Sequence, residues 1–482
     1  MSATLLTGFR PDVAVREQPD GTLSISLSSQ TVLIRSVPNG LARAIRCLAT
    51  TGASQADLEK LVLAHDGIAG MSLWYYWHRQ FLQLNFICYP LEVDRVRIAT
   101  VLSTTPELLT AFPAIRPTDA CQLSRFASLR LDPELSCLRL ETPLSPFALL
   151  LHDPSAVTLI GALSTSKTVE ELAAVLPEHR AVIEPLLARL LFARLAVTID
   201  ETGATAETSH PTLPYWEFHD LLFHSQSRIG RSSGAFGGTY RFGKHDPPAP
   251  VVKPNMSEEI YPLYRPDLSQ LIEQDASFSA VLSARRSKRA FDDEHPLTGQ
   301  QVGEFLYRVA RIQELLPASP SHRELELSKR PYPAGGALYE LDIYVAILHS
   351  FDLPPGLYQY NPLQHELCKL FESTAELQSM VHTCRRAALP DQEAPGQTQA
   401  LLLITSRFPR LSWKYESIAY ATTLKNTGAL YQTMYLAAAA MGLAGTAVGS
   451  GDADLFARLS GIDYYEETLV GEFLLGTAKA TP

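Results

Sequence analysis

A dense run of basic residues is the first feature of the sequence with the composition of a binding site. The stretch "SARRSKRAF" places Arg285, Arg286, Lys288 and Arg289 around Ser287, and we expect it to occupy about one helical turn. The planar guanidinium group carries a fixed fork of N–H donors that matches phosphate oxygens, and each charge-assisted hydrogen bond is worth roughly 1.5–3 kcal/mol. A solvated basic surface is the alternative. Because the chain as a whole has a formal net charge of −10, we favour a phosphate site.

A loop rich in proline and glycine is the second candidate. The stretch "RPYPAGGALYELDIYV" (330–345) combines Pro331 and Pro333 with Gly335 and Gly336. Proline fixes φ, whereas glycine has no side chain and lets other groups approach the backbone. The alternating apolar residues that follow predict a strand. The loop is therefore either an ordinary turn or one wall of a ligand site.

Lys414 and Tyr415, in "LSWKYES", are the third candidate because both side chains can exchange a proton. Lysine and tyrosine normally hold their protons at neutral pH, so a general base of either type needs an environment that favours the deprotonated form. A surface lysine beside a packing tyrosine is the alternative. The sequence alone supports the two interpretations equally.

These candidates lie in a C-terminal region that mixes helices and strands, which indicates an α+β domain. "LDIYVAIL" (341–348) and "TLVGEFLLGTAK" are typical of strands, and "PPGLYQYNPLQHELCKL" (354–370) predicts two strands around a turn. The uncharged stretch "ALYQTMYLAAAAMGLAGTAV" (429–448) predicts a long apolar helix that is just long enough to span a bilayer. Because alanine makes up much of it, its hydrophobicity is modest, and we expect a helix in a soluble core.

The first ~200 residues contain a degenerate repeat. In each copy, strands in which apolar and polar residues alternate precede three helices and a further strand. This is the order of a winged-helix unit. Winged helices commonly bind DNA, but the candidate recognition segments "SQADLEKLVLAHDG" and "TVEELAAVLPEHRAVIE" are rich in acidic residues. We therefore expect a peptide-binding or structural role and no nucleic-acid partner.

The length of 482 residues favours several domains. We expect winged-helix-like repeats at 1–105 and 106–205, a linker and extended arm at 206–270, and an α+β domain at 271–482 that is large enough for an oxidoreductase. The six cysteines include no CxxC pair, so we expect no metal site and no disulfide framework. The first residues include a charged residue and a proline before any long apolar run, so they do not resemble a secretory signal. We therefore expect a cytoplasmic protein with no membrane partner.

Together these motifs resemble the FMN-dependent nitroreductase superfamily. The resemblance covers about residues 212–482 and is carried by the Arg-Arg-Ser-x-Arg opening, the glycine loop that enters a strand, and the Ala-rich segment ending in "MGLAGTAV". Within the superfamily, "RPYPAGGALYELDIYV", "GLYQYNP", the Lys414-Tyr415 pair and "EFHDLLFHSQSRIGR" resemble the SagB-type azoline dehydrogenases, with cyanobactin oxidases as the nearest match. The winged-helix repeats also fit those oxidases.

The resemblance implies a homodimer that binds FMN at the subunit interface. It assigns the phosphate to Arg285, Arg286, Ser287 and Arg289, and the wall against the flavin to Pro333, Ala334, Gly335 and Gly336. The family usually has serine where this sequence has Ala334.

The reaction implied is dehydrogenation of a peptide thiazoline or oxazoline to the thiazole or oxazole. Lys414 and Tyr415 are then the catalytic residues, and the partner is a heterocyclised ribosomal precursor peptide that the N-terminal repeats dock. Two other hypotheses are a general NAD(P)H-dependent nitroreductase or quinone reductase, and a non-catalytic peptide-binding scaffold.

Overall fold

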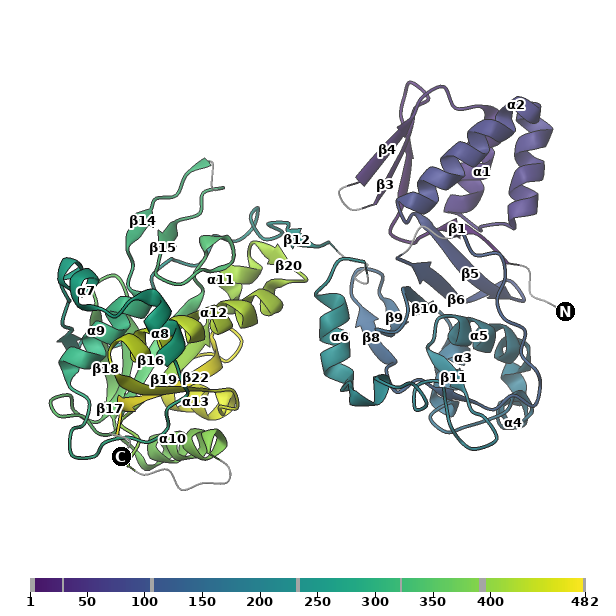
Figure 1. Ribbon diagram of the computed structural model, residues 1–482. Helices are drawn as coiled ribbons and strands as arrows, with labels where there is room; N and C mark the ends of the chain where they lie inside the picture. The colour runs from purple at the N-terminus through teal and green to yellow at the C-terminus, as the bar shows by residue number, and fades with distance from the viewer. Residues whose placement is uncertain are drawn as a thin grey trace. The chain divides into compact units, whose positions relative to one another are not determined.

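The computed structural model describes residues 5–27, 30–104, 108–230, 235–320, 323–389 and 396–479. The chain divides into two compact units, Met1–Gly234 and Ala235–Pro482, each with its own sheets and core (Figure 1). Within the described ranges, no helix is long and apolar enough to cross a membrane. The finer domain boundaries expected from the sequence stay predictions.

The N-terminal unit repeats one order of elements. In the first copy a three-stranded sheet, β2-β3-β4, precedes helices α1 and α2, and α2 bends at Gly67, where φ is +64°. The bend divides α2 into two, so three helical segments follow the strands. The elements of this copy are β1 (Gly8–Phe9), β2 (Ala14–Glu17), β3 (Leu23–Leu27), β4 (Gln30–Ile34), α1 (Asn39–Ala49), α2 (Gln55–Gln83), β5 (Ile87–Val93) and β6 (Val96–Ser103).

The second copy has strands, then helices, then a short strand. Its elements are β7 (Cys121–Leu123), β8 (Ser128–Asp132), β9 (Cys137–Glu141), β10 (Phe147–Leu151), α3 (Pro154–Ala162), α4 (Val169–Val175), η1 (Pro177–His179), α5 (Arg180–Phe192) and β11 (Ala196–Thr198). The last strand of the first copy, β6, pairs antiparallel with β10, which joins the copies in one sheet of order β1-β5-β6-β10-β9-β8. One apolar core runs through both copies. The unit ends with η2 (Leu213–Tyr215) and α6 (Phe218–Gln226).

The C-terminal unit is built on a seven-stranded antiparallel sheet of order β13-β18-β17-β16-β19-β22-β21. The strands are β13 (Ile260–Pro262), β16 (Leu341–Ile347), β17 (Gly356–Asn361), β18 (Glu366–Glu372), β19 (Ala400–Ser406), β21 (Leu443–Val448) and β22 (Thr468–Thr477). Two-stranded ribbons join β12 (Gly237–Gly238) to β20 (Tyr415–Glu416) and β14 (Glu314–Leu316) to β15 (Leu327–Lys329).

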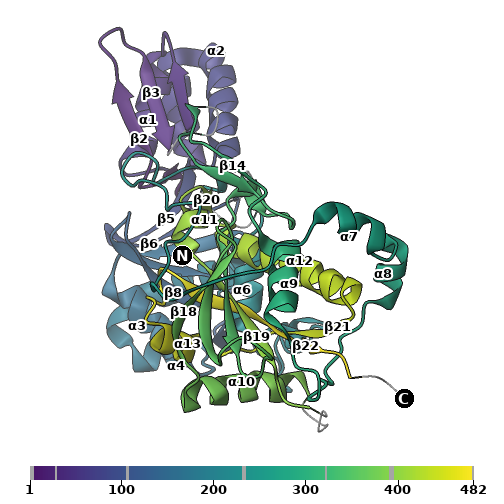
Figure 2. The same ribbon diagram turned by 90° about the vertical axis from the view of Figure 1, so that its left-hand side faces the viewer.

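Helices cover both faces of this sheet. Side chains alternate along the central strand β16, so Ile343 and Val345 pack with α9 and α12 whereas Tyr344 and Ala346 pack with α10 and α13. Figure 2 shows α10 on the far side of the sheet from α9 and α12. The helices are α7 (Leu268–Gln274), α8 (Phe278–Ala284), α9 (Gly299–Ala310), η4 (Gly335–Ala337), α10 (Ala375–Ala388), α11 (Phe408–Ser412), α12 (Ala419–Ala440) and α13 (Ala453–Ser460).

The expected α+β class is confirmed, as are the strands at 341–348 and 354–370. Two local expectations are wrong. The stretch 429–448 is not one helix, because α12 ends at Ala440, Gly442 turns the chain with φ +70°, and β21 follows as a buried strand. The basic run is not a helical turn, because α8 ends at Ala284 and residues 285–290 form no helix.

Candidate active site

The glycine loop and the Lys414-Tyr415 pair meet in the C-terminal unit. A Cβ atom placed on Gly336 would lie 2.6 Å from Nζ of Lys414 and 2.6 Å from the hydroxyl oxygen of Tyr415. Both polar groups therefore converge on the open side of this glycine. Two of the three predicted segments are brought together here, although they lie far apart in the sequence.

Part of the glycine loop has an unfavourable backbone conformation. Three residues have positive φ: Gly336 at +64°, Ala337 at +56° and Tyr339 at +47°. For a residue with a Cβ atom, the left-handed region costs roughly 1–2 kcal/mol. Such conformations persist when neighbouring groups fix them, and they concentrate at functional sites.

Buried side chains hold both ends of the loop. The N–H of Gly335 donates a hydrogen bond to Oδ1 of Asn426, 3.0 Å away on α12. At the other end, the guanidinium group of the buried Arg410 donates to the carbonyl oxygen of Leu338. Because Arg410 lies on α11, directly before Trp413 and Lys414, it ties the loop to the segment that carries the lysine.

A short strand and a small apolar cluster position Lys414 and Tyr415. β20 begins at Tyr415 and pairs with β12, so that Gly238 lies opposite Tyr415. Trp413 is buried against Leu338 and Leu411, and its indole N–H donates to the carbonyl oxygen of Asp246 at 2.8 Å. The segment after residue 235 therefore forms part of the site.

Tyr240, on that segment, is a site residue that the sequence did not reveal. Its ring centroid lies 5.8 Å from Nζ of Lys414, and its N–H donates to the carbonyl oxygen of Lys414 at 3.1 Å. Glu340 and Asn426 were also missed. The only signals for these two were an acid directly before the apolar strand β16 and an amide in the largely apolar helix α12.

The basic run surrounds Tyr435 of α12. The hydroxyl groups of Ser287 and Tyr435 are 3.1 Å apart, and Cζ of Arg285 lies 5.5 Å from the tyrosine ring centroid. Burial raises the pKa of Tyr435, but hydrogen bonds from its surroundings and the cation of Arg289 outweigh burial and lower it overall. Arg286 and Lys288 are exposed, and Arg286 donates to the carbonyl oxygens of Ser283 and Arg285.

Two observations fit a flavin phosphate and a flat ring system. In the described part of the chain, the buried Nε of Arg289 has no hydrogen-bond partner, and a buried guanidinium N–H without an acceptor is costly. A phosphate oxygen would satisfy it. Gly336 has no side chain, so a planar group could approach its backbone beside Lys414 and Tyr415.

The two clusters occupy opposite sides of one helix. Asn426, at the glycine loop, and Tyr435, at the basic run, are nine residues apart on α12. At about 100° per residue, this separation turns the second side chain about 180° from the first. The structure therefore does not bring the basic run and the glycine loop together within one chain.

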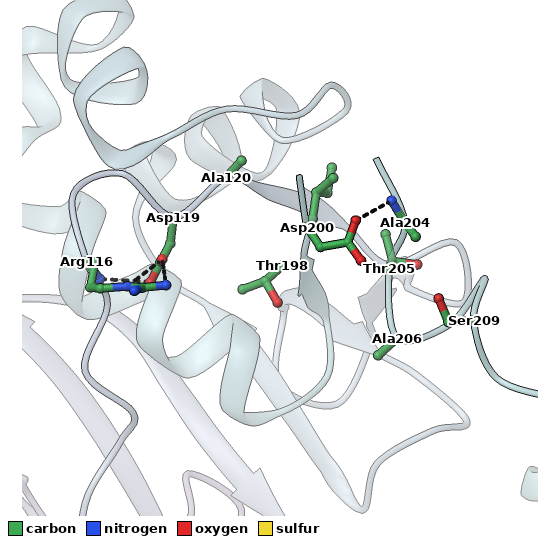
Figure 3. Close-up of a pocket in the computed structure, with 10 residues that line it drawn as sticks. Arg116, Asp119, Ala120, Thr198, Asp200, Ala204, Thr205, Ala206 and Ser209 are labelled. Atoms are coloured by element: carbon green, nitrogen blue, oxygen red, sulfur yellow. Dashed lines mark hydrogen bonds and ion pairs between the residues drawn. The ribbon is translucent and has the colours of Figure 1, made fainter. Parts of the chain in front are cut away.

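A hollow in the N-terminal unit contains none of the predicted residues (Figure 3). Its volume is about 470 Å³, and its two acids are already bonded: Asp119 to Arg116 at 2.8 Å, and Asp200 to the N–H of Ala204 at 3.0 Å. No group of three His, Cys, Asp or Glu that could hold a metal ion occurs in the described ranges. Nothing in this hollow suggests catalysis.

Comparisons with known proteins match three consecutive parts of the chain. Residues 1–112 match a family described as the ThcOx helix turn helix domain, residues 121–233 match Cyanobactin oxidase ThcOx, and residues 282–477 match the Nitroreductase family. The C-terminal unit therefore carries a nitroreductase-family domain, and the N-terminal unit matches two models named for the cyanobactin oxidase ThcOx. The resemblance seen in the sequence is confirmed, and the superfamily generally binds flavin.

Individual relatives of the chain are distant. The Microcin B17-processing protein McbC of Escherichia coli is 27% identical over 38% of this chain and 62% of that protein. The Putative nitroreductase MJ1384 of Methanocaldococcus jannaschii is 24% identical over 38% of this chain and 82% of that protein. A crystal structure of a putative nitroreductase from Ralstonia eutropha is 21% identical, covers 49% of this chain and 97% of its own, and has a TM-score of 0.36. The chain thus spans less than two thirds of the length of the microcin-processing relative.

Proposed function

We propose that this protein is an FMN-dependent azoline dehydrogenase that converts thiazolines or oxazolines of a ribosomal precursor peptide to thiazoles or oxazoles. The observation that carries the proposal is the convergence of Lys414 Nζ and Tyr415 OH on Gly336 within a nitroreductase-family domain. The matches to cyanobactin oxidase models and to a protein named for microcin processing support a peptide substrate.

FMN is the proposed cofactor, and the chain offers two sets of residues for it. Arg285, Ser287 and Arg289 would hold the phosphate, with Arg289 supplying an unused N–H. Arg286 would contribute charge at the surface. Pro333, Ala334, Gly335 and Gly336 would lie against the ring, although the N–H of Gly335 is already bonded to Asn426.

The chemistry requires two hydrogens to leave adjacent carbons of the azoline ring. When bound, FMN supplies the acceptor for one of them as hydride and passes the electrons on to an acceptor such as oxygen. The other hydrogen leaves as a proton, for which Lys414 Nζ and Tyr415 OH are the nearby groups. The apolar cluster around Trp413 and Leu338 would keep water away from this side of the site.

A homodimer would bring the two sets of residues onto one flavin. Because the basic run and the glycine loop face opposite sides of α12, we propose that each flavin takes its phosphate site from one subunit and its ring wall from the other. Large apolar side chains on the helices concerned are exposed in the single chain, which fits a covered interface: Phe278 and Leu282 on α8, and Tyr420 and Leu424 on α12.

The N-terminal repeats are proposed to dock the precursor peptide. Of the segments expected to act as recognition helices, α4 carries Glu170 and Glu171 in its first turn, which disfavours a phosphate backbone as partner. A cytoplasmic location, where such peptides are made, stays a prediction.

The deciding experiment uses the purified full chain and a synthetic heterocyclised peptide. We expect yellow protein with about one FMN per chain, and a loss of two mass units per azoline oxidised. Protein that cannot be loaded with FMN contradicts the proposal. Rapid flavin reduction by NAD(P)H with no peptide oxidation favours a general nitroreductase, and flavin-free peptide binding favours a scaffold.

A further inference from the structure

We propose that Asn426 is a positioning residue that sets the glycine loop against the cofactor, and that the buried Glu340 fixes the direction of its amide group. The inference rests on the proposed function in one respect only, that the loop faces FMN. It assigns roles to two residues that the sequence interpretation did not single out.

The contacts form a continuous chain from strand to helix to loop. Nδ2 of Asn426 lies 2.9 Å and 3.2 Å from the two carboxylate oxygens of Glu340, and Oδ1 of Asn426 accepts the N–H of Gly335 at 3.0 Å. Glu340 is fully buried, and Asn426 is 5% exposed. Water therefore does not compete for these bonds.

The acceptor character of a carboxylate makes the arrangement directional. An ionised carboxylate can only accept hydrogen bonds, so it faces the NH₂ group of the Asn426 amide. The amide oxygen then points the other way, to Gly335. If the amide were reversed, its NH₂ group would face the N–H of Gly335 and two donors would oppose each other, which costs about 1–3 kcal/mol for a buried group.

The loop requires such an anchor because its own backbone is strained. Ala337 and Tyr339 both have positive φ, and the two backbone hydrogen bonds within the loop are 3.2 Å and 3.4 Å long. Asn426 fixes the end that precedes Gly336, while Arg410 fixes the end that follows it through Leu338. The position of the Gly336 face relative to Lys414 and Tyr415 therefore depends on Asn426.

A reciprocal exchange of the two side chains tests this assignment. In Asn426→Asp, two carboxyl groups face each other, and neither can donate a hydrogen bond while both are ionised. In the double variant Glu340→Gln/Asn426→Asp, the amide of residue 340 donates to the carboxylate of residue 426, which can again accept the N–H of Gly335. The double variant has the same net charge and nearly the same shape as the wild type.

The matched control is Thr427→Val, because Thr427 is the next buried residue of α12 and, among the residues that the structure describes, its hydroxyl group bonds only to the carbonyl oxygen of Thr423 in the same helix. For each protein we would measure the Kd for FMN of the folded apoprotein, the visible circular dichroism of the bound flavin, and Tm. Neither binding readout depends on the azoline substrate.

We expect Asn426→Asp to weaken FMN binding about tenfold and to alter the flavin circular dichroism, and the double variant to recover to within about threefold of wild type. Thr427→Val should bind FMN as wild type does. A lower Tm with unchanged FMN affinity in Asn426→Asp would show that the pair only stabilises the core and would overturn the inference, as would a double variant that recovers nothing. Wild-type protein that binds FMN but oxidises no azoline defeats the proposed function and leaves this inference standing; wild-type protein that binds no FMN defeats both.

Discussion

The ring of Tyr240 lies within reach of two cations, 5.8 Å from Nζ of Lys414 and 4.1 Å from Cζ of Arg323, measured from the ring centroid. An aromatic face attracts a cation at these distances. The segment that follows residue 235 thus reaches the lysine of the candidate site by a side chain as well as by the β12–β20 ribbon.

Replacing this ring tests its role. We expect Tyr240→Leu to lower kcat/KM for azoline oxidation about three- to thirtyfold, because a cation–π contact is worth about 0.5–2 kcal/mol. Tyr240→Phe keeps the ring and should stay within about threefold of wild type. Equal losses in the two variants would assign the effect to the hydroxyl group and not to the ring.

The catalytic assignment predicts a loss of turnover without a loss of cofactor. Lys414→Met removes the ammonium group at similar length, and Tyr415→Phe removes only the hydroxyl. If either side chain accepts the proton that leaves the azoline ring, its variant should lose about 100-fold in kcat, since general acid–base catalysis contributes about 10²–10⁴-fold. The FMN content, read from the absorption spectrum, should be unchanged. Activity that survives both changes removes both residues from the mechanism.

Gly336 should tolerate no side chain. A Cβ atom at this position would press on Lys414 and Tyr415, and the left-handed φ adds roughly 1–2 kcal/mol of strain. We expect Gly336→Ala to lower kcat at least about tenfold. Gly161→Ala is the control, because Gly161 is helical and an added Cβ has open space around it. A fully active Gly336→Ala protein would mean that the flavin and substrate approach from elsewhere.

The basic run predicts a difference between FMN and riboflavin, which lacks the phosphate. Arg289→Gln and Arg285→Gln should each weaken FMN binding about tenfold, because a charge-assisted hydrogen bond is worth about 1.5–3 kcal/mol. Riboflavin binding should change little. Arg458→Gln, at an exposed position of α13, should affect neither ligand. Fluorescence titration of the apoprotein gives both constants, and parallel losses for the two ligands would contradict a phosphate site.

Glu472 predicts a dependence of stability on pH. Burial raises the pKa of this carboxyl group to about 7, and the N–H groups of Ser450 and Gly451 oppose the rise only in part. Because the native state binds this proton more tightly than the unfolded state, its stabilising contribution is complete below about pH 4.5 and is lost as the pH rises through about 7. Glu472→Gln removes the titration, so its free energy of unfolding relative to wild type should rise by about 3 kcal/mol between pH 4 and pH 8. Denaturant unfolding at several pH values measures this, and a difference that does not vary with pH would contradict it.

The sequence predicted those parts of the fold in which local pattern and burial agree. The strand expected at 341–348 is β16, in which all seven residues are buried. The prediction of a helix at 429–448 is wrong beyond Ala440, because an apolar run does not distinguish a buried helix from a buried strand. The helical turn expected for the basic run is wrong, because tertiary contacts hold these residues in another conformation. One such contact is the hydrogen bond from the N–H of Lys288 to the carbonyl oxygen of Gly445.

The site was predictable only in part, for a related reason. Residue types made Lys414, Tyr415 and the glycine loop candidates and the family resemblance gave them roles, but no spacing rule links residues 336 and 414. Asn426 and Glu340 have ordinary local surroundings, and their significance lies in a contact across 86 residues of sequence. Tyr240 joins the site through pairing of β12 with β20, two strands of two residues each, which are too short to leave a sequence pattern.

The pairing of β6 with β10 makes the two copies of the N-terminal repeat depend on each other. Each copy of the repeat resembles a module that could fold alone, yet the closing strand of the first copy supplies a neighbour for the fourth strand of the second. Cutting the chain at the apparent repeat boundary would leave β10 with an unpaired apolar edge, the kind of surface that promotes aggregation. Because the two copies share one sheet and one apolar core, we expect them to unfold together.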